Sequence, residues 1–311
     1  MLVYVVTGGL GFIGQALATQ LKNAGHKVII ASPVKSCNDD RFEWIKFDLN
    51  DHSTINNIIR SRPDYIYHLA WSTTPASAEI NPSADINTNL TGTICLLNTL
   101  AKTYPVPILL MSSGGTVYGL SKTETIKETH ELNPISIYGI TKCAMERYAL
   151  QSNLFESLDI RIARVSNPFG IKQSLGKPQG AATIFGRRII LGEKIEIWGS
   201  GNTIRDYIDV DDVAEGLQAI MSIDKKLCSK FPVFNIGSGV GLSLNNLIKC
   251  LETAVGLKAN VVFSEQRTFD IPSNILNIDK INSISKWAPR NAGKRLEAMM
   301  VNLEKELNNS A

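Results

Sequence analysis

Short apolar runs rich in β-branched residues recur through the first half of the 311-residue chain, and segments of helical length separate most of them. We interpret these runs as strands, at Val3–Thr7, Val28–Ala31, Trp44–Phe47, Tyr65–Trp71, Ile108–Ser112 and Ile160–Arg164. Alternating strands and helices are typical of a parallel sheet with helices on both faces, and its strands are apolar because both faces are buried. The pattern therefore predicts an α/β fold with a doubly wound parallel sheet.

The alternation breaks after Gly170, where a loop rich in Gly and Pro leads to a short helix and a strand at Ile195–Trp198. Asp209–Ile220 and Phe234–Gly237 then have the patterns of a helix and a strand that return to the main sheet. The rest of the chain is expected to build a smaller α/β part. We therefore predict two domains, with these bounds: 1–170 and 205–237 for the first, 171–204 and 238–311 for the second.

Composition excludes several classes of function. The net charge is only +3 and no long basic run occurs, so we expect neither a nucleic-acid nor a membrane partner. The five cysteines are widely spaced without a C-x-x-C pair, which favours reduced thiols over disulfides or a zinc site, and no metal is expected. No apolar stretch approaches the ~18 residues of a membrane span, and no signal peptide precedes the first strand. We therefore expect a cytoplasmic protein that acts on small molecules.

The glycine-rich segment Thr7–Gly14 directly follows the first predicted strand and opens a helix. In such a strand-turn-helix unit, Gly8 permits the tight turn, Gly11 lets the backbone approach a pyrophosphate, and Gly14 permits close packing of helix on strand. The N-terminus of the helix attracts an anion through its free N–H groups. These groups are expected to belong to Phe12, Ile13 and Gly14. The segment predicts a Rossmann-type site for a dinucleotide, NAD or NADP.

The residue that would choose between these cofactors is unusual. An acidic residue about 20 positions beyond the glycines usually holds the ribose hydroxyls of NAD, but Ser32 stands in that place. Because serine carries no charge to repel a 2′-phosphate, and Lys35 or Arg41 would supply positive charge, we expect NADP to bind at least as well as NAD. Asp48 and Leu49 are suited to the adenine amine and to backbone contacts, although an aspartate after a strand is also a common turn residue.

Tyr138 and Lys142 lie four residues apart in a helical pattern, so their side chains share one face. A nearby ammonium favours the phenolate, which lowers the tyrosine pKa from ~10 toward the range of a general acid or base. Such pairs also arise by chance on amphipathic helices. The pair therefore gains its meaning from the other motifs.

Further motifs follow one another in order along nearly the whole chain, namely His68–Ala70, Asn87–Thr93 and Ser112–Gly119. Together with the glycine turn and the Tyr138/Lys142 pair, they make the sequence resemble the extended short-chain dehydrogenase/reductases, especially nucleotide-sugar epimerases and dehydratases of the UDP-galactose 4-epimerase type. The resemblance implies a Rossmann-type domain with a smaller α/β C-terminal substrate-binding domain. It also implies NAD or NADP and a nucleotide-diphosphate sugar as ligands.

By that resemblance Tyr138 is the acid/base at the sugar hydroxyl, while Lys142 lowers its pKa and bonds the nicotinamide ribose. Leu69, Ala70 and Asn89 are implied beside the cofactor. The residues implied around the substrate diphosphate, ribose and base are Asn167, Trp198, Arg205, Arg267 and Asp270. Two arginines agree with the chemistry of a diphosphate, because guanidinium groups match phosphate oxygens.

The sequence also departs from the family pattern. The catalytic serine or threonine of the family falls on Gly114, which has no hydroxyl, and Ser113 and Thr116 are the candidates to replace it. Some epimerases carry a lysine after the fourth strand, where this chain has Ser72-Thr73.

Our leading hypothesis is a nucleotide-hexose 4-epimerase of the UDP-glucose/galactose type, working through a transient 4-keto intermediate. The alternative is an NADPH-dependent reductase of a 4-keto-6-deoxy nucleotide sugar, which Ser32 favours. A 4,6-dehydratase is disfavoured because such enzymes carry Asp-Glu where this chain has Gly115-Thr116. A non-catalytic sensor is disfavoured because the Tyr138/Lys142 pair and both arginines are retained.

The resemblance further implies a role in surface-polysaccharide precursor synthesis. It also implies a homodimer, formed through helices near Asn89–Lys102 and Tyr138–Gln151.

Overall fold

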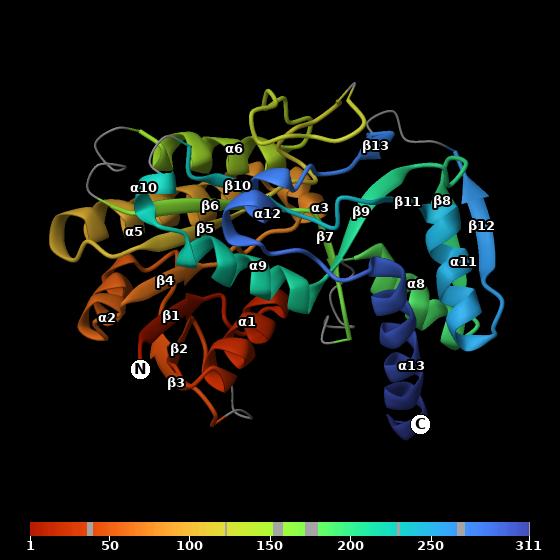
Figure 1. Cartoon of the computed structure of the whole chain (residues 1–311), viewed down its shortest axis with the longest axis horizontal. Coiled ribbons are helices and arrows are strands. Elements are labelled where there is room, and N and C mark those ends of the chain that lie inside the picture. The colour runs from red at the N-terminus through yellow and green to blue at the C-terminus, as the bar shows by residue number, and fades with distance from the viewer. Residues whose placement is uncertain are drawn as a thin grey trace.

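The computed structural model describes residues 1–35, 40–121, 123–151, 158–171, 180–228, 231–265 and 271–310. A seven-stranded parallel sheet forms its larger part (Figure 1). The strands, in the spatial order β10-β6-β5-β4-β1-β2-β3, are Val233–Ile236, Ile160–Val165, Ile108–Ser113, Tyr65–His68, Val3–Thr7, Lys27–Ser32 and Glu43–Lys46. This order is that of a Rossmann-type fold, and it reverses between β1 and β4. The predicted parallel sheet is confirmed, including the return of the strand near Phe234.

Helices cover both faces of this sheet, because successive side chains of each strand point to opposite faces. Tyr4 and Val6 of β1 pack into one core, whereas Val5 packs into the other. On the first face lie α1 (Phe12–Asn23), α9 (Val210–Ser222) and α12 (Asp279–Ser285). On the second face lie α2 (Ile55–Arg60), α5 (Thr91–Thr103) and α6 (Ile137–Ala149). The short elements are η1 (His52–Thr54), α3 (Pro75–Ile80), α4 (Pro82–Ala84), the π-helical turn η2 (Asp85–Leu90) and α10 (Lys225–Cys228).

The fourth strand is shorter than the sequence predicts. It was expected to reach Trp71 but ends at His68, which pairs with Thr7, the last residue of β1. Leu69 still donates its N–H to the carbonyl of Thr7, at 3.2 Å. Beyond that point β1 has turned into the glycine segment, so β4 loses its partner on that side, although β5 continues to Ser113. Residues 69–74 therefore form a loop at the carboxyl edge of the sheet, where open α/β sheets bind ligands.

A smaller part of the molecule lies beside the main sheet and is built from short strands and three helices (Figure 1). One sheet contains β7 (Asn167–Phe169), β9 (Ile204–Asp209), β11 (Gly241–Ser243) and β13 (Ser273–Asn274). A parallel pair contains β8 (Lys194–Trp198) and β12 (Asn260–Ser264). A separate apolar core joins them to α8 (Ala181–Ile190), α11 (Leu244–Val255) and α13 (Ala292–Ser310). No helix in the described ranges combines the length and apolar character that crossing a membrane requires.

The Asp206 carboxylate ties the two parts together. It is fully buried on β9 and accepts hydrogen bonds from Ser166 Oγ (3.3 Å), Ser238 N (2.7 Å), Ser238 Oγ (2.7 Å), Gly239 N (3.2 Å) and Leu276 N (3.1 Å). Burial raises the pKa of Asp206, while the hydrogen bonds from Ser238, Leu276 and Gly239 act in the opposite direction. These donors come from three segments that are distant in sequence. One side chain thus fixes β9 against the ends of β6 and β10.

We expect Asp206→Asn to lower the free energy of unfolding by about 2 kcal/mol or more, because an amide nitrogen would face donors that then lose their acceptor. Urea unfolding followed by circular dichroism measures the change. The control is Asp224→Asn at an exposed aspartate whose Oδ1 accepts a bond from Lys226 N. Equal stability of the two variants would show that the Asp206 bonds do not join the two parts.

Candidate functional site

The glycine turn has the geometry that its sequence predicts. Gly8 has a φ of +68°, and a Cβ there would lie 2.8 Å from the backbone nitrogen of Ala70. A Cβ on Gly14 would lie 2.7 Å from Gly9 Cα, so the helix packs on the strand only because position 14 is glycine. A side chain at either position would fill the space between the ends of β1 and β4, which we call the cradle. The backbone there is free to approach a ligand.

The N-terminus of α1 points its free N–H groups into this cradle. The N-cap residue, Gly11, offers no side-chain cap, and the first backbone bond of the helix is from Gln15 N to Gly11 O, at 2.9 Å. The N–H groups of Phe12, Ile13 and Gly14 precede that bond and have no helical acceptor. Uncapped amides at a glycine-lined helix start fit a pyrophosphate. The residues present therefore fit a dinucleotide.

Ser32 ends β2 and is buried, and its hydroxyl is already engaged. Its Oγ donates to Val34 O at 2.7 Å and accepts from Trp44 Nε1 at 2.9 Å. Lys35 is exposed, and Arg41 stacks on the ring of Phe42. The hydroxyl keeps one free lone pair for a ribose hydroxyl, and no carboxylate stands at this position.

Asp48 and Leu49 follow β3 at the same edge of the sheet. Asp48 Oδ1 accepts a hydrogen bond from Asn50 N at 2.9 Å, as in a turn, and Leu49 is buried against Gly92. Both readings of Asp48 thus remain open, since a turn bond to one oxygen leaves the other available.

Asn89 is fully buried in the π-helical turn and holds the loop after β4. Its Oδ1 accepts from Ser72 N (2.7 Å) and Ser72 Oγ (3.0 Å), and its Nδ2 donates to Thr73 Oγ1 (3.0 Å) and Asp85 Oδ1 (2.9 Å). The side chain of Asn89, which was expected beside the cofactor, therefore hydrogen-bonds to other protein groups and positions them. It lies where the loop carrying Leu69 and Ala70 turns back.

Tyr138 and Lys142 lie on the first turns of α6, at the carboxyl edge of β5. Ser136 caps the helix, since its Oγ accepts from Gly139 N at 3.2 Å. Lys142 is 1% exposed; its Nζ donates to Met111 O at 2.8 Å and lies 5.6 Å from the centre of the Tyr138 ring. A buried ion pair between Glu146 of α6 and Arg164 of β6, 2.6 Å between Oε2 and Nη2, fixes the helix against the sheet.

Burial dominates the electrostatics of this pair. It lowers the pKa of Lys142 to about 7, although Asp85 and Glu146 raise it. It raises the pKa of Tyr138, and the charge of Asp85 adds to that effect. The expectation that Lys142 lowers the tyrosine pKa is therefore wrong for the ligand-free protein, because desolvation of the phenolate outweighs the ammonium.

The loop after β5 places the two substitute hydroxyls differently. Thr116 Oγ1 is buried without a hydrogen-bond partner, and Ser113 is half-buried at the end of the strand. Gly114, where the family hydroxyl falls, faces the core: a Cβ would lie 2.5 Å from Leu276 Cδ1 and 3.2 Å from Arg164 O. A Cβ on Gly115 would instead lie 3.7 Å from Asn167 Oδ1. The backbone at position 114 thus leaves no room for a side chain.

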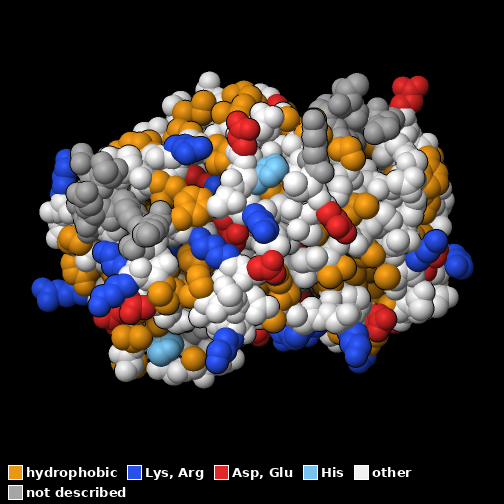
Figure 2. Space-filling view, turned by 45° about the horizontal axis from the view of Figure 1, so that its top comes forward, with side chains coloured by type: hydrophobic (Ala, Val, Ile, Leu, Met, Phe, Trp, Pro, Cys, Tyr) orange, Lys and Arg blue, Asp and Glu red, His pale blue; other side chains and the backbone are white. Residues whose placement is uncertain are grey.

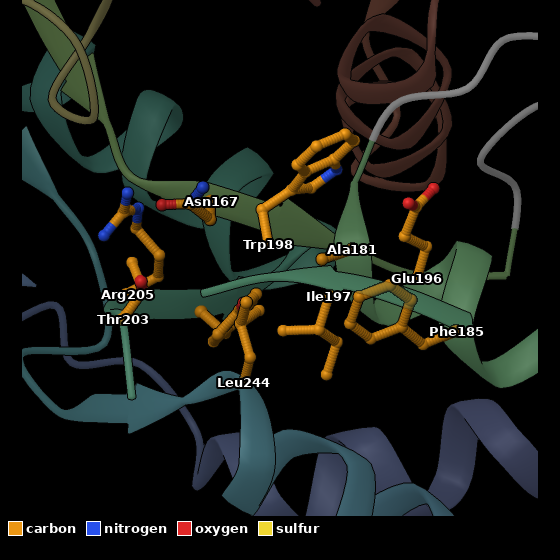
Figure 3. A pocket seen from close by; sticks show the side chains of 10 residues that line it. Asn167, Ala181, Phe185, Glu196, Ile197, Trp198, Thr203, Arg205 and Leu244 are labelled. Carbon is orange, nitrogen blue, oxygen red and sulfur yellow. The ribbon is translucent and has the colours of Figure 1, made fainter. Parts of the chain in front are cut away.

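A pocket of about 240 Å³ in the smaller part gathers three of the expected substrate residues (Figure 3). Figure 3 shows Arg205 and Asn167 toward one end and Glu196 toward the other, with Trp198 between them. Arg205 Nη1 donates to Ile204 O (2.8 Å) and Ile271 O (2.7 Å). Asn167 Oδ1 is buried without a partner, and the Trp198 side chain is 39% exposed. Arg267 and Asp270 lie outside the described residues.

Two residues of the site were missed by sequence reasoning. Trp71 lies with its ring face against Lys142, and Asp85 is a fully buried carboxylate of the π-helical turn. Asp85 Oδ1 accepts from Thr73 Oγ1 and Asn89 Nδ2, whereas its Oδ2 is buried without a partner. The available signals were that Trp71 follows a strand end and that Asp85 lies one helical turn before Asn89.

We expect Gly114→Ser to destabilise the protein by about 1–3 kcal/mol through overpacking against Leu276, without restoring a useful hydroxyl. Gly115→Ser, with open space at its Cβ, is the matched control and should change stability by less than about 0.5 kcal/mol. Thermal unfolding of both variants measures the difference. A stable Gly114→Ser protein with raised turnover would contradict this geometry.

Comparison with known proteins agrees with this site. Residues 4–237 match the family described as NAD dependent epimerase/dehydratase. A putative UDP-glucose 4-epimerase of Methanocaldococcus jannaschii is 29% identical over 289 residues, which cover 92% of each chain. A dTDP-4-dehydro-6-deoxyglucose reductase of Escherichia coli is 30% identical over 299 residues, again covering 92% of each chain.

Solved structures with a similar fold include UDP-glucose 4-epimerases. The UDP-glucose 4-epimerase of Thermotoga maritima, determined with UDP-glucose, has a TM-score of 0.88 at 29% identity and covers 98% of this chain and 99% of its own. That of Thermus thermophilus, in complex with NAD, has a TM-score of 0.87 at 23% identity, covers 97% and 99%, and supports the fold alone. The motifs, the sheet order and these matches agree, and the chain belongs to the NAD-dependent epimerase/dehydratase family.

Proposed function

We propose that this protein is a nucleotide-hexose 4-epimerase that oxidises a sugar carbon to a ketone and reduces it again from the other face. The observation that carries the proposal is the Tyr138/Lys142 pair at the carboxyl edge of the sheet, with Lys142 buried and Tyr138 partly buried, near the glycine cradle. Relatives named UDP-glucose 4-epimerase support the choice of reaction. A UDP-hexose is accordingly the first substrate to test.

Each residue of the proposed site has its own role in the reaction. Tyr138 exchanges a proton with the sugar hydroxyl, and Lys142 bonds the cofactor ribose. The nicotinamide supplies reversible hydride acceptance when it is bound. Thr116 replaces the missing hydroxyl at position 114, because its buried Oγ1 lacks a protein partner, and Ser113 is the second candidate.

We assign the cofactor and the nucleotide sugar to different parts of the chain. The cofactor occupies the cradle of residues 1–170 and 205–237, contacting the first turn of α1 and the loops carrying Ser32, Asp48–Leu49, Leu69–Ala70 and Asn89. The nucleotide sugar occupies the part formed by 171–204 and 238–311, together with the strands β7 and β9 that the small sheet shares with it. Arg205 grips the diphosphate with Asn167, and Trp198 lies by the base. Arg267 and Asp270 complete the set on grounds of sequence alone.

A reductase of a 4-keto-6-deoxy nucleotide sugar is the second candidate. Two observations favour it, the absence of an acid at Ser32 and the relative named dTDP-4-dehydro-6-deoxyglucose reductase. It would use the same Tyr138/Lys142 pair in one direction. Net consumption of reduced cofactor distinguishes it from an epimerase, which returns the cofactor to its starting state.

We also propose a cytoplasmic homodimer that serves surface-polysaccharide synthesis. Exposed apolar side chains on adjoining elements support the dimer, namely Ile80 of α3, Ile86 of η2 and Ile140 of α6. The described cysteines Cys95, Cys143, Cys228 and Cys250 are free thiols, which fits a reducing compartment. Basic and acidic side chains are interspersed on the face shown in Figure 2.

We expect Tyr138→Phe to lower kcat by at least ~10²–10⁴-fold while the protein still binds cofactor, because the ring remains and only the acid/base is lost. The measurement is conversion of UDP-glucose and UDP-galactose, followed by chromatography of the epimers. Tyr148→Phe on the same helix, whose hydroxyl accepts a bond from Asn98, is the control. Near-normal epimerisation by Tyr138→Phe would reject the proposal.

Cofactor choice gives the next prediction. We expect the unmodified protein to bind NADP at least as well as NAD, and Ser32→Asp to shift the preference toward NAD by more than tenfold, about 1.4 kcal/mol, since a carboxylate repels the 2′-phosphate. The new carboxylate can still accept the Trp44 N–H. Ser32→Ala, which adds no charge, is the control. Dissociation constants at one salt concentration measure the preference, and strong selectivity of the unmodified protein for NAD would refute it.

A further inference from the structure

Trp71 stands in the catalytic centre, although no motif singled it out. It lies in the loop after β4, which Asn89 fixes through the backbone N–H of Ser72. The ammonium of Lys142 lies 3.4 Å from the centre of the indole. The Tyr138 ring meets it edge-on, with ring centres 6.0 Å apart and an interplanar angle of 71°. One side chain therefore contacts both members of the pair.

The ring face and the N–H group of this indole take part in different interactions. The ring face accounts for the cation–π contact with Lys142, which a phenylalanine would also make, more weakly. The Nε1–H is buried and has no hydrogen-bond partner in the protein. Leaving such a donor unpaired costs about 1–3 kcal/mol, and an indole N–H is a donor only. Among the residues that the structure describes, none accepts from it, so the N–H is available to an acceptor on a ligand.

The chemistry of the site calls for fixed hydrogen-bond donors at the reacting sugar oxygen. The position of the family hydroxyl is Gly114, and a side chain there would enter the core against Leu276. A sugar oxygen that loses or gains a proton at Tyr138 carries negative charge during the step. A fixed donor in a site without water stabilises that charge.

We propose that the indole N–H of Trp71 donates to the sugar oxygen whose proton Tyr138 exchanges, as a second donor beside the Thr116 hydroxyl. This inference rests on the proposed function. When the ketone is reduced, a bound reduced nicotinamide would supply the hydride of the new C–H bond, and the π pair of the C=O bond would move to oxygen. That oxygen takes the proton of the Tyr138 hydroxyl. The Trp71 N–H keeps its proton throughout and only strengthens its bond as charge develops.

Two variants separate the N–H from the ring. Trp71→Phe keeps a ring against Lys142 and removes the donor, so kcat for UDP-hexose epimerisation should fall ~10²–10³-fold, with UDP affinity unchanged. Trp71→Leu removes both and should lose more. The control is Trp287→Phe, a buried indole of the main core whose N–H is also unpaired, which should keep wild-type turnover. If Trp71→Phe turns over within threefold of wild type, the donor role is wrong.

A second measurement uses the unmodified, cofactor-loaded protein and does not depend on activity. The chain has four tryptophans, so its indole ¹H–¹⁵N signals are few, and Trp71→Phe assigns the one of interest. UDP-glucose should move the Trp71 proton signal downfield, whereas UDP, which lacks the hexose, should not. Equal response to both ligands would overturn the proposal. Loss of turnover in Tyr138→Phe together with an unmoved indole signal would leave the enzyme function intact and reject only the role of Trp71.

Discussion

The buried carboxylate of Asp206 is the interaction on which the arrangement of the site depends. It accepts five hydrogen bonds from segments that follow β6 and β10 and from Leu276. Arg205, the next residue along β9, lines the nucleotide pocket with Asn167. Because Asp206 is anchored to the main sheet, the pocket is held at the edge where Tyr138 and Lys142 lie. The residues that would contact a ligand spanning both parts are therefore already in position before it binds.

The proposed site contains polar groups that folding has removed from water. Lys142 is buried with a carbonyl and an indole face as neighbours, and Asp85 has one oxygen without a partner. Such groups destabilise the ligand-free protein, since each buried polar atom without a bond costs free energy. Trp71 Nε1, Thr116 Oγ1 and Asn167 Oδ1 share this property. A polar ligand that hydrogen-bonds to these atoms removes that cost. Groups that lower the stability of the ligand-free protein thus raise its affinity for the ligand.

Much of the fold was predictable because its signals are local. The strand-turn-helix of residues 3–23 requires glycine at position 8 for its positive φ and at position 14 for close contact with Gly8 and Gly9, and both reasons are local. The spacing of Tyr138 and Lys142 is likewise a property of one helix. The pKa of Tyr138 was predicted wrongly, because it depends on burial by elements from elsewhere in the chain. The end of β4 was misplaced for a similar reason, since it is set by where β1 stops.

The sequence by itself determined the alternation of strands and helices, the glycine turn at the start of α1 and the shared helix face of Tyr138 and Lys142. Each of these follows from periodicity or from the steric needs of adjacent residues. Only the tertiary structure decided that position 114 faces Leu276, that the Ser32 hydroxyl is engaged by Trp44, and that Trp71 lies on Lys142. These facts depend on distances between segments far apart in the chain. Burial and packing set such distances, and a linear pattern does not record them.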